Sequence, residues 1–307
     1  MYDQSDPRAA LSTASGTASA GRGAAGFAPA QFGLFDRLAP AESSKDARCW
    51  YLRGQNFVLN YIEAQAGACF ARHAQPDEYA LIVPDAEMAL AVDTGDESVE
   101  VSGGSVVFVP PGYSVVRSKA AGRIVRLVTS RSTDMMAKAL NAEAYRDARP
   151  EIPPFEAWPP AADGPRIRVY PLVVAPEPGR FGTIYRCSTF MINAIDPLEG
   201  PRDATRLSPH HHDDFEQCSL AVEGSFVHYL RWPWTTNLEH WREDEHALCG
   251  SPSAVVIPPP AIHTSRAVGE GLNRLVDIFS PPRLDFSQRP GWVLNAGDYP
   301  MPRTPAM

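Results

Sequence analysis

Three histidines and two adjacent polar residues carry the clearest chemical signal in this 307-residue sequence. His210 and His212 stand two residues apart, so in a strand both imidazoles would project from the same face. His263 follows a proline turn after a later predicted strand, where it could lie opposite the first pair, and Glu216 or Gln217 could add a fourth ligand. Three imidazoles with a carboxylate or amide oxygen suit one divalent transition metal such as iron, manganese, nickel, copper or zinc.

The elements that must position these ligands are predicted to be strands. Thirty prolines and 22 glycines are too many for long helices, and short β-rich runs alternate with turn residues. In the first half the predicted strands are 56–62, 79–83, 87–92, 98–101, 105–109 and 124–128. In the second half they are 167–174, 183–195, 218–222, 225–230, 254–258 and 274–279. Many short strands separated by turns indicate a sandwich or a barrel.

The two halves of the chain repeat each other. Residues 105–115 align with 253–263 at an offset of 148, and the same offset places the Arg-Leu-Val run at 126–128 on the identical run at 274–276. A duplicated barrel follows. The expected organisation is a flexible N-terminal tail at 1–30, a first barrel at 31–132, a helix and proline-rich linker at 133–165, and a second barrel at 166–300.

The histidine-bearing segments resemble the two sequence motifs of the cupin superfamily. The first motif is HxH, three or four residues, Glu or sometimes Gln, six residues and Gly, and the second is Gly, a short strand, PxG, two residues and His. The matching positions are His210, His212, Gly224, Pro258 and His263. Pro260 stands where the family usually has glycine. The resemblance implies an all-β protein of two tandem cupin (double-stranded β-helix, or jelly-roll) barrels, with a metal site in the C-terminal one.

The fourth ligand stays open between Glu216 and Gln217. Alternation along a strand allows only one of them to face inward unless a bulge intervenes. Glu216 supplies an anion and its apolar followers fit an inward face, whereas Gln217 keeps the spacing to Gly224 that the cupin pattern requires.

The first barrel keeps the frame of these motifs without most of the ligands. Val115 stands at the position of the last histidine, and only His73 remains of the imidazoles, with Gln75 and Glu78 nearby. We therefore expect the first barrel to bind no metal.

An insertion after the first motif, at 231–249, supplies the candidate for substrate binding. Arg231 lies there among three tryptophans and could hold the carboxylate of an organic substrate. Arg231 and Glu216 are the two candidate catalytic residues.

The expected function is that of a metal-dependent bicupin enzyme. The preferred hypothesis is an Fe(II) dioxygenase acting on a small aromatic or carboxylate-bearing substrate, because open positions on a three-histidine site can hold substrate and oxygen together. The resemblance points the same way, since gentisate, homogentisate and quercetin dioxygenases are two-barrel relatives of this kind. The alternatives are a redox-neutral decarboxylase, isomerase or lyase, and a non-catalytic ligand-binding bicupin.

Composition excludes several other classes of partner. The net charge is −8, and no basic run is long enough to follow a phosphate backbone, which argues against nucleic acid. We expect a cytoplasmic protein without membrane contact that binds a small molecule and could form a homo-oligomer. The five cysteines are scattered without a CxxC pair, which argues against disulfides and thiolate zinc sites.

Overall fold

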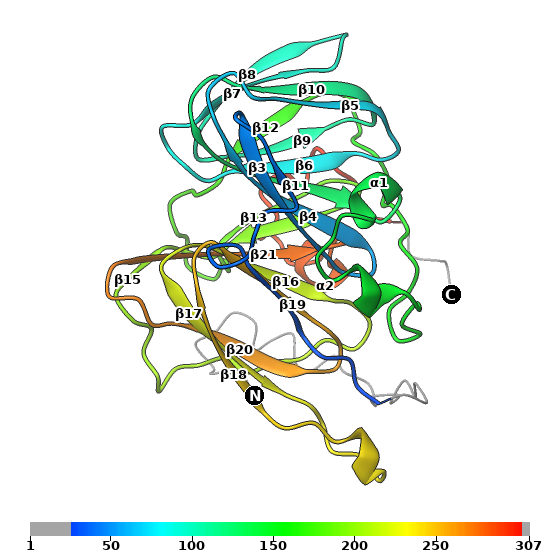
Figure 1. Cartoon of the computed structure of the whole chain (residues 1–307), viewed down its shortest axis with the longest axis vertical. Helices are drawn as coiled ribbons and strands as arrows, with labels where there is room; N and C mark the ends of the chain where they lie inside the picture. Colours follow the sequence, from blue (N-terminus) through cyan, green and yellow to red (C-terminus); the bar gives the residue numbers. More distant parts are fainter. Residues whose placement is uncertain (1–25, 303–307) are drawn as a thin grey trace.

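The computed structural model describes residues 26–302, which form two β-barrels stacked along the long axis of the molecule (Figure 1). Each barrel pairs one seven-stranded sheet with a smaller sheet, of four strands in the first barrel and three in the second. The all-β fold of two jelly-roll barrels expected from the sequence is confirmed. Within the described residues no helix is long and apolar enough to cross a membrane.

The first barrel is built from two sheets. The large sheet has the order β12-β9-β6-β11-β4-β3-β2 and the small one β5-β10-β7-β8. The bounds are β2 (Glu42–Ser43), β3 (Ala47–Arg53), β4 (Phe57–Ala64), β5 (Cys69–Gln75), β6 (Tyr79–Val83), β7 (Ala89–Asp93), β8 (Ser98–Ser102), β9 (Ser105–Val109), β10 (Gly112–Ser118), β11 (Gly122–Thr129) and β12 (Arg168–Pro171).

The second barrel repeats this plan. Its large sheet has the order β1-β19-β16-β21-β14-β13, with β15 added on β21, and its small sheet is β18-β17-β20. The bounds are β1 (Gln31–Leu34), β13 (Thr183–Arg186), β14 (Met191–Ala194), β15 (Leu198–Glu199), β16 (Gln217–Glu223), β17 (Ser225–Arg231), β18 (Glu245–Gly250), β19 (Ser253–Ile257), β20 (Ile262–Ala267) and β21 (Leu272–Phe279).

Between residues 26 and 302, helical structure is confined to four short elements. They are α1 (Thr133–Met136), η3 (Ala142–Tyr145), η4 (Leu238–His240) and α2 (Leu284–Ser287). The first two fall at the start of the expected linker, and the rest of that segment is irregular up to β12.

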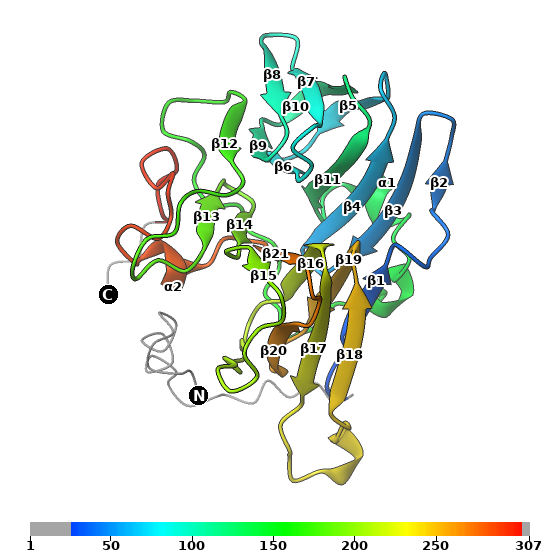
Figure 2. The same cartoon turned by 90° about the vertical axis from the view of Figure 1, so that its left-hand side faces the viewer.

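The barrels exchange one strand each, which differs from the organisation expected from the sequence. β1, placed by that expectation in the first barrel, pairs antiparallel with β19 of the second (Figure 2). β12, placed in the second barrel, pairs antiparallel with β9 of the first. Each exchanged strand is the edge strand of a seven-stranded sheet and pairs with the next strand, β19 or β9, whose outer backbone N–H and C=O groups would otherwise lack partners.

The expected flexible tail at 1–30 is described only from residue 26 onward, and residues 1–25 lie outside the described part. Residues 26–30 lie against the second barrel, where the indole Nε1 of Trp232 donates to the carbonyl of Ala28 at 2.9 Å. Ala28 and Ala30 are buried.

The largest hydrophobic core lies between the barrels rather than inside either one. Apolar side chains from the two seven-stranded sheets pack together there, among them Leu59 and Leu127 from the first barrel and Leu220 and Val276 from the second. The opposite face of each large sheet lines the interior of its own barrel.

Candidate metal centre

The three expected histidines come together in the interior of the second barrel. His210 and His263 form an isolated antiparallel bridge, with backbone hydrogen bonds of 3.0 Å from His210 N to His263 O and 2.7 Å from His263 N to His210 O. This bridge holds the segment before β16 against the start of β20. The ligand nitrogens of His210, His212 and His263 all lie within 4.8 Å of one another.

Hydrogen bonds to carbonyl groups set the protonation of two of the imidazoles. Nδ1 of His210 lies 3.0 Å from the carbonyl of Ser208, and Nδ1 of His263 lies 2.9 Å from that of Ala261. A carbonyl oxygen only accepts, so in both rings Nδ1 carries the hydrogen and Nε2 carries the lone pair. Donation of the second ring nitrogen to a carbonyl is the usual support of a metal-bound histidine.

His212 is held in its neutral, metal-binding form. Its ring is buried and stacks on Phe215 with 4.2 Å between centroids. Burial lowers the pKa of His212 well below its usual value, and the nearby Arg283 guanidinium and the other two histidines act in the same direction.

Gln217 turns its amide oxygen toward these rings. Its Nε2 donates to Ser219 Oγ at 3.0 Å and to Asp277 Oδ1 at 3.1 Å, which fixes the orientation of the amide. Oε1 then lies 3.0 Å from His212 Nε2 and 3.4 Å from His263 Nε2. The contact with His263 joins two acceptor atoms, and a cation between them would make it favourable.

The spacing of the donors fits a transition metal. Two ligands each about 2.1 Å from a metal ion lie at most about 4.2 Å apart. Ligands at tetrahedral or right angles about such an ion lie roughly 3.0 to 3.4 Å apart, so the imidazole nitrogens, which lie within 4.8 Å of one another, would close by up to about 1.8 Å on binding. Three neutral imidazoles and one amide oxygen therefore form a donor set that matches the expected divalent ion.

Glu216 faces the other way, into the contact between the barrels. Its Oε2 accepts from the backbone N of Gln55 at 2.6 Å, and its Oε1 accepts from Tyr145 Oη at 2.6 Å. Burial raises the pKa of Glu216 to about 6, against the lowering effect of these two hydrogen bonds. Strand alternation at the start of β16 thus separates Glu216 from the histidines, and its expected roles as ligand or catalytic residue have no support in its position.

Glu78 is the counterpart of Glu216 in the first barrel. It precedes β6 as Glu216 precedes β16, and it accepts from the backbone N of Ser188 at 2.9 Å and from Tyr299 Oη at 2.6 Å. We call these two sets of hydrogen bonds the glutamate clasps: Glu216 with Gln55 and Tyr145, and Glu78 with Ser188 and Tyr299. Sequence reasoning missed them, although an Asn-x-x-x-Tyr pattern after each barrel, at 141–145 and 295–299, was a visible signal.

The asparagine that begins each Asn-x-x-x-Tyr segment hydrogen-bonds to both backbone groups of one arginine in the barrel that the segment follows. Asn141 accepts from Arg53 N at 2.9 Å and donates to Arg53 O at 2.8 Å. Asn295 treats Arg186 in the same way, at 3.0 and 2.8 Å. The duplication seen in the sequence therefore extends to the segments that follow each barrel.

A cavity of about 500 Å³ opens at the histidines. His210, His263 and Gln217 line it on the side of the metal centre. Its charged lining residues are Arg180, Asp196, Arg202, Asp203, Arg206 and Asp277. The three basic and three acidic side chains balance, so a bound divalent cation would make the cavity positive and suited to an anion.

Arg231, the other expected catalytic residue, does not line this cavity. It lies at the exposed end of β17 and pairs with Asp244, with Nε 3.0 Å from Oδ1. Trp234 and Trp241 stack on each other 4.5 Å apart in the same insertion. The rest of the insertion extends away from the barrel as a hairpin arm (Figure 1). Arg231 itself pairs with Ile262, next to His263, but its exposed side chain points away from the cavity.

In the first barrel the residues at the corresponding motif positions each have different surroundings. His73 is exposed beside the ring of Tyr113, Gln75 accepts from Arg72 Nε at 2.8 Å, and Glu78 forms its clasp. Val115 is buried at the position of the last ligand.

Comparison with known proteins shows the fold and no closer relationship. No family model matches the chain, and no curated protein sequence matches it. Oxalate decarboxylase of Bacillus subtilis, which has Mn(II) centres, superposes with a TM-score of 0.54 at 12% identity, covering 84% of this chain and 81% of its own. AerE from Microcystis aeruginosa gives 0.53 at 9%, covering 78% and 94%. The 7S globulin of Momordica charantia gives 0.52 at 13%, covering 82% and 84%. The chain therefore has the tandem cupin fold.

Proposed function

We propose that the second barrel binds one divalent metal ion through His210, His212, His263 and Gln217, and that the protein is a metal-dependent enzyme for a small carboxylate substrate. The observation that carries the proposal is the meeting of three imidazoles and one oriented amide oxygen at the wall of a cavity of about 500 Å³.

The redox-neutral alternative has more support than the dioxygenase hypothesis. Oxalate decarboxylases are among the proteins that share the fold, and one of them carries Mn(II). A metal ion bound by neutral ligands keeps its full charge and would act as a Lewis acid on a substrate carboxylate or carbonyl. We therefore propose decarboxylation, isomerisation or lyase chemistry.

The residues of the chain would bind, orient and exchange protons. Arg180, Arg202 and Arg206 bring positive charge to the cavity wall, where a second anionic group of the substrate can lie. Asp196 and Asp203 are carboxylates on the same wall and are the groups available to carry a proton. Asp277 acts on the metal centre indirectly, because it holds the amide of Gln217.

The test is a turnover screen of small mono- and dicarboxylic acids with protein loaded with Mn(II), Fe(II), Ni(II) or Zn(II), in air and under nitrogen. The proposal expects turnover under nitrogen, measured as CO₂ release or a new product by NMR, and its loss in His212→Ala. Arg206→Ala should raise KM at least about tenfold, whereas the matched variant Arg231→Ala, outside the cavity, should not change it.

Two outcomes would replace the proposal. Turnover that requires Fe(II) and consumes oxygen stoichiometrically would restore the dioxygenase hypothesis. Tight binding of a carboxylate without turnover under any condition would identify a ligand-binding protein.

A further inference from the structure

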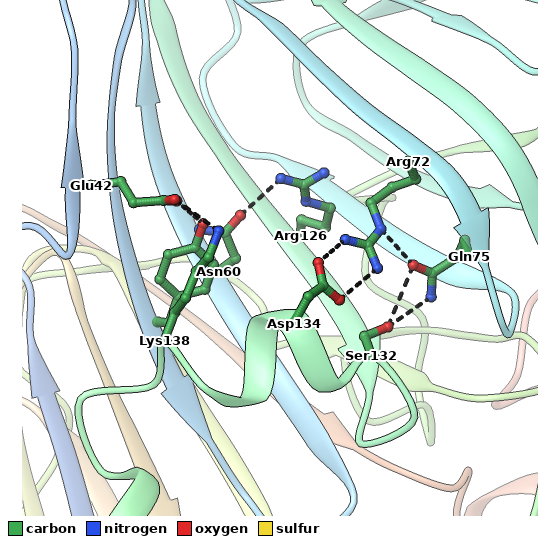
Figure 3. A network of polar contacts seen from close by, with 9 residues as sticks. Glu42, Asn60, Arg72, Gln75, Arg126, Ser132, Asp134 and Lys138 are labelled. Atoms are coloured by element: carbon green, nitrogen blue, oxygen red, sulfur yellow. Dashed lines mark hydrogen bonds and ion pairs between the residues drawn. The ribbon is translucent and has the colours of Figure 1, made fainter.

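A second polar cavity lies in the first barrel. None of its lining residues belongs to the candidate metal centre. It measures about 350 Å³, within the size range of small-molecule sites. Its charged lining residues are Glu42, Arg72, Arg126, Asp134 and Lys138. Figure 3 shows these five side chains converging from the sheet and from the segment of α1.

All but one of these charges have a partner of opposite sign. Arg72 donates to both oxygens of Asp134, at 2.5 and 3.1 Å, and Lys138 donates to Glu42 at 2.8 Å. Arg126 stands between the two pairs (Figure 3). Three basic and two acidic side chains leave one positive charge in the cavity.

Arg126 is a buried guanidinium without a carboxylate. It is 5% exposed, and its Nη2 donates to the neutral Asn60 Oδ1 at 3.1 Å. Among residues 26–302 its Nε has no hydrogen-bond acceptor. Burial lowers the pKa of Arg126, but a guanidinium remains charged at any physiological pH. A buried charge of this kind is costly unless an anion compensates it.

The register of the sheets makes Asp277 the counterpart of Arg126 in the second barrel, three residues beyond Arg274, with which the sequence repeat aligns Arg126. In the first barrel Arg126 lies between Asn60 and Leu81. In the second barrel the same row runs from Asn193 through Asp277 to Ser219. Asp277 supports the candidate cation site through Gln217. The row that carries a carboxylate in one barrel therefore carries a guanidinium in the other.

The remaining walls of the cavity are suited to an organic group. Phe70 lies with its ring centroid 5.8 Å from the Arg126 guanidinium carbon, and Ala71, Cys49 and Met135 also line the space. An inorganic anion would use the charge but leave this apolar surface uncovered.

We propose that the first barrel binds a small organic monoanion, whose carboxylate lies on Arg126 and whose apolar part lies against Phe70 and Met135. This site is independent of the metal centre and of the reaction proposed for it. The two barrels thus bind ions of opposite charge.

Benzoate is a suitable probe, with benzamide as its uncharged counterpart. Full-length protein with ¹³C-methyl methionine is titrated with each compound and followed by NMR, because the methyl group of Met135 reports on this cavity and not on the second barrel. Benzoate is expected to shift the Met135 resonance saturably with one site per chain, and benzamide at the same concentrations is not.

Variants decide whether Arg126 is responsible. Arg126→Met should weaken benzoate binding at least about tenfold, and Arg126→Lys should restore part of it. Arg117→Met, which removes an exposed arginine from the same barrel, should leave it unchanged. Because Arg126→Met removes an uncompensated buried charge, its melting temperature should match or exceed that of the wild type, which verifies that the variant is folded.

The proposal fails if benzoate leaves the Met135 resonance unmoved, or if Arg126→Met binds benzoate as the wild type does. A chloride or phosphate titration that shifts Met135 as strongly as benzoate would also overturn it, since the cavity would then bind inorganic anions.

Discussion

Two adjacent residues at the start of β16 have different tasks because a strand turns successive side chains to opposite faces. Gln217 faces the histidines of the second barrel, and Glu216 faces Gln55 and Tyr145 across the contact between the barrels. The carboxylate, which is the stronger ligand type for a divalent cation, is therefore used for contact between the barrels, and the weaker amide lies at the proposed metal centre.

This division predicts different losses for the two alanine variants. Gln217→Ala removes the proposed amide ligand and should weaken Mn(II) binding by at least about 10- to 100-fold, the range seen when a hydrogen-bond partner of a metal ligand is removed. Glu216→Ala should bind Mn(II) as the wild type does and have a lower melting temperature. Glu78→Ala is the matched control, because it breaks the other clasp. Isothermal titration with Mn(II) measures the affinity, and the reverse order of effects would reject Gln217 as a ligand.

His228 on β17 is a residue whose protonation opposes folding. It is buried, with Nδ1 2.8 Å from Ser265 Oγ, and burial followed by the effect of His263 lowers its pKa to about 4. Between its unfolded pKa near 6.5 and about 4, the unfolded chain binds more protons than the folded one. Stability from this residue is therefore complete above pH 6.5 and is lost as the pH falls toward 4.

Urea denaturation at pH 7.5 and pH 4.5 tests this effect. Between pH 7.5 and pH 4.5 the free energy of unfolding of the wild type should fall by up to about 3 kcal/mol more than that of His228→Gln, since each unit of pKa shift is worth about 1.4 kcal/mol. His73→Gln, which changes an exposed histidine, should follow the wild type. Parallel losses in His228→Gln and the wild type would show that His228 does not contribute.

At the scale of the element, the sequence predicted best the strands that are buried on both faces. β6, β9, β11 and β19 are rich in valine, leucine and isoleucine and were placed nearly at their observed bounds. The strands that were missed are β1, β2, β3, β5, β10, β15, β18 and β20, and the expected strand 183–195 is divided into β13 and β14. β5 and β18 alternate with solvent-exposed positions and carry charged or small residues, so no apolar run marks them.

The partners of the strands could not be predicted from local patterns. The exchange of β1 and β12 depends on which sheet edge is open, a property of the folded barrels. The same limit applies to the candidate site. The spacing of the sequence identified the three histidines, but only the register of β16 shows that Gln217 and not Glu216 faces them. Arg126 was missed because an arginine inside an apolar strand gives no sequence signal of its lack of a partner.

Gly224, the glycine of the first motif, lies at the tight turn between β16 and β17. Its φ is +84°, and a Cβ there would lie 2.3 Å from Asn273 Oδ1 and 2.8 Å from the carbonyl of Leu272. Gly224→Ala should therefore cost about 1–3 kcal/mol in the free energy of unfolding. Gly271→Ala, where a Cβ meets nothing within 4 Å, should stay within about 0.5 kcal/mol of the wild type. Equal denaturation midpoints would contradict the close contact at this turn.

At the scale of the whole molecule, three features join the barrels into one unit. They share the largest hydrophobic core, exchange the strands β1 and β12, and hold each other through the glutamate clasps. Separating the barrels would expose apolar surface from both seven-stranded sheets and leave two sheet edges unpaired.

Thermal unfolding should therefore proceed as one transition. Differential scanning calorimetry is expected to show a single peak whose calorimetric and van't Hoff enthalpies agree, the criterion of a two-state process. Chelator should shift this peak as a whole to a lower temperature. Two resolved peaks, or a chelator effect on only part of the heat absorbed, would show that the barrels unfold independently.

The metal content of the purified protein tests the central claim most directly. Protein prepared without chelator, reconstituted with Mn(II) and freed of excess metal, is analysed by inductively coupled plasma mass spectrometry beside His212→Ala. The account expects close to one metal ion per wild-type chain, because three histidines and Gln217 form one site, and close to none in the variant. A wild type without metal, or a His212→Ala variant that retains it, would contradict the account.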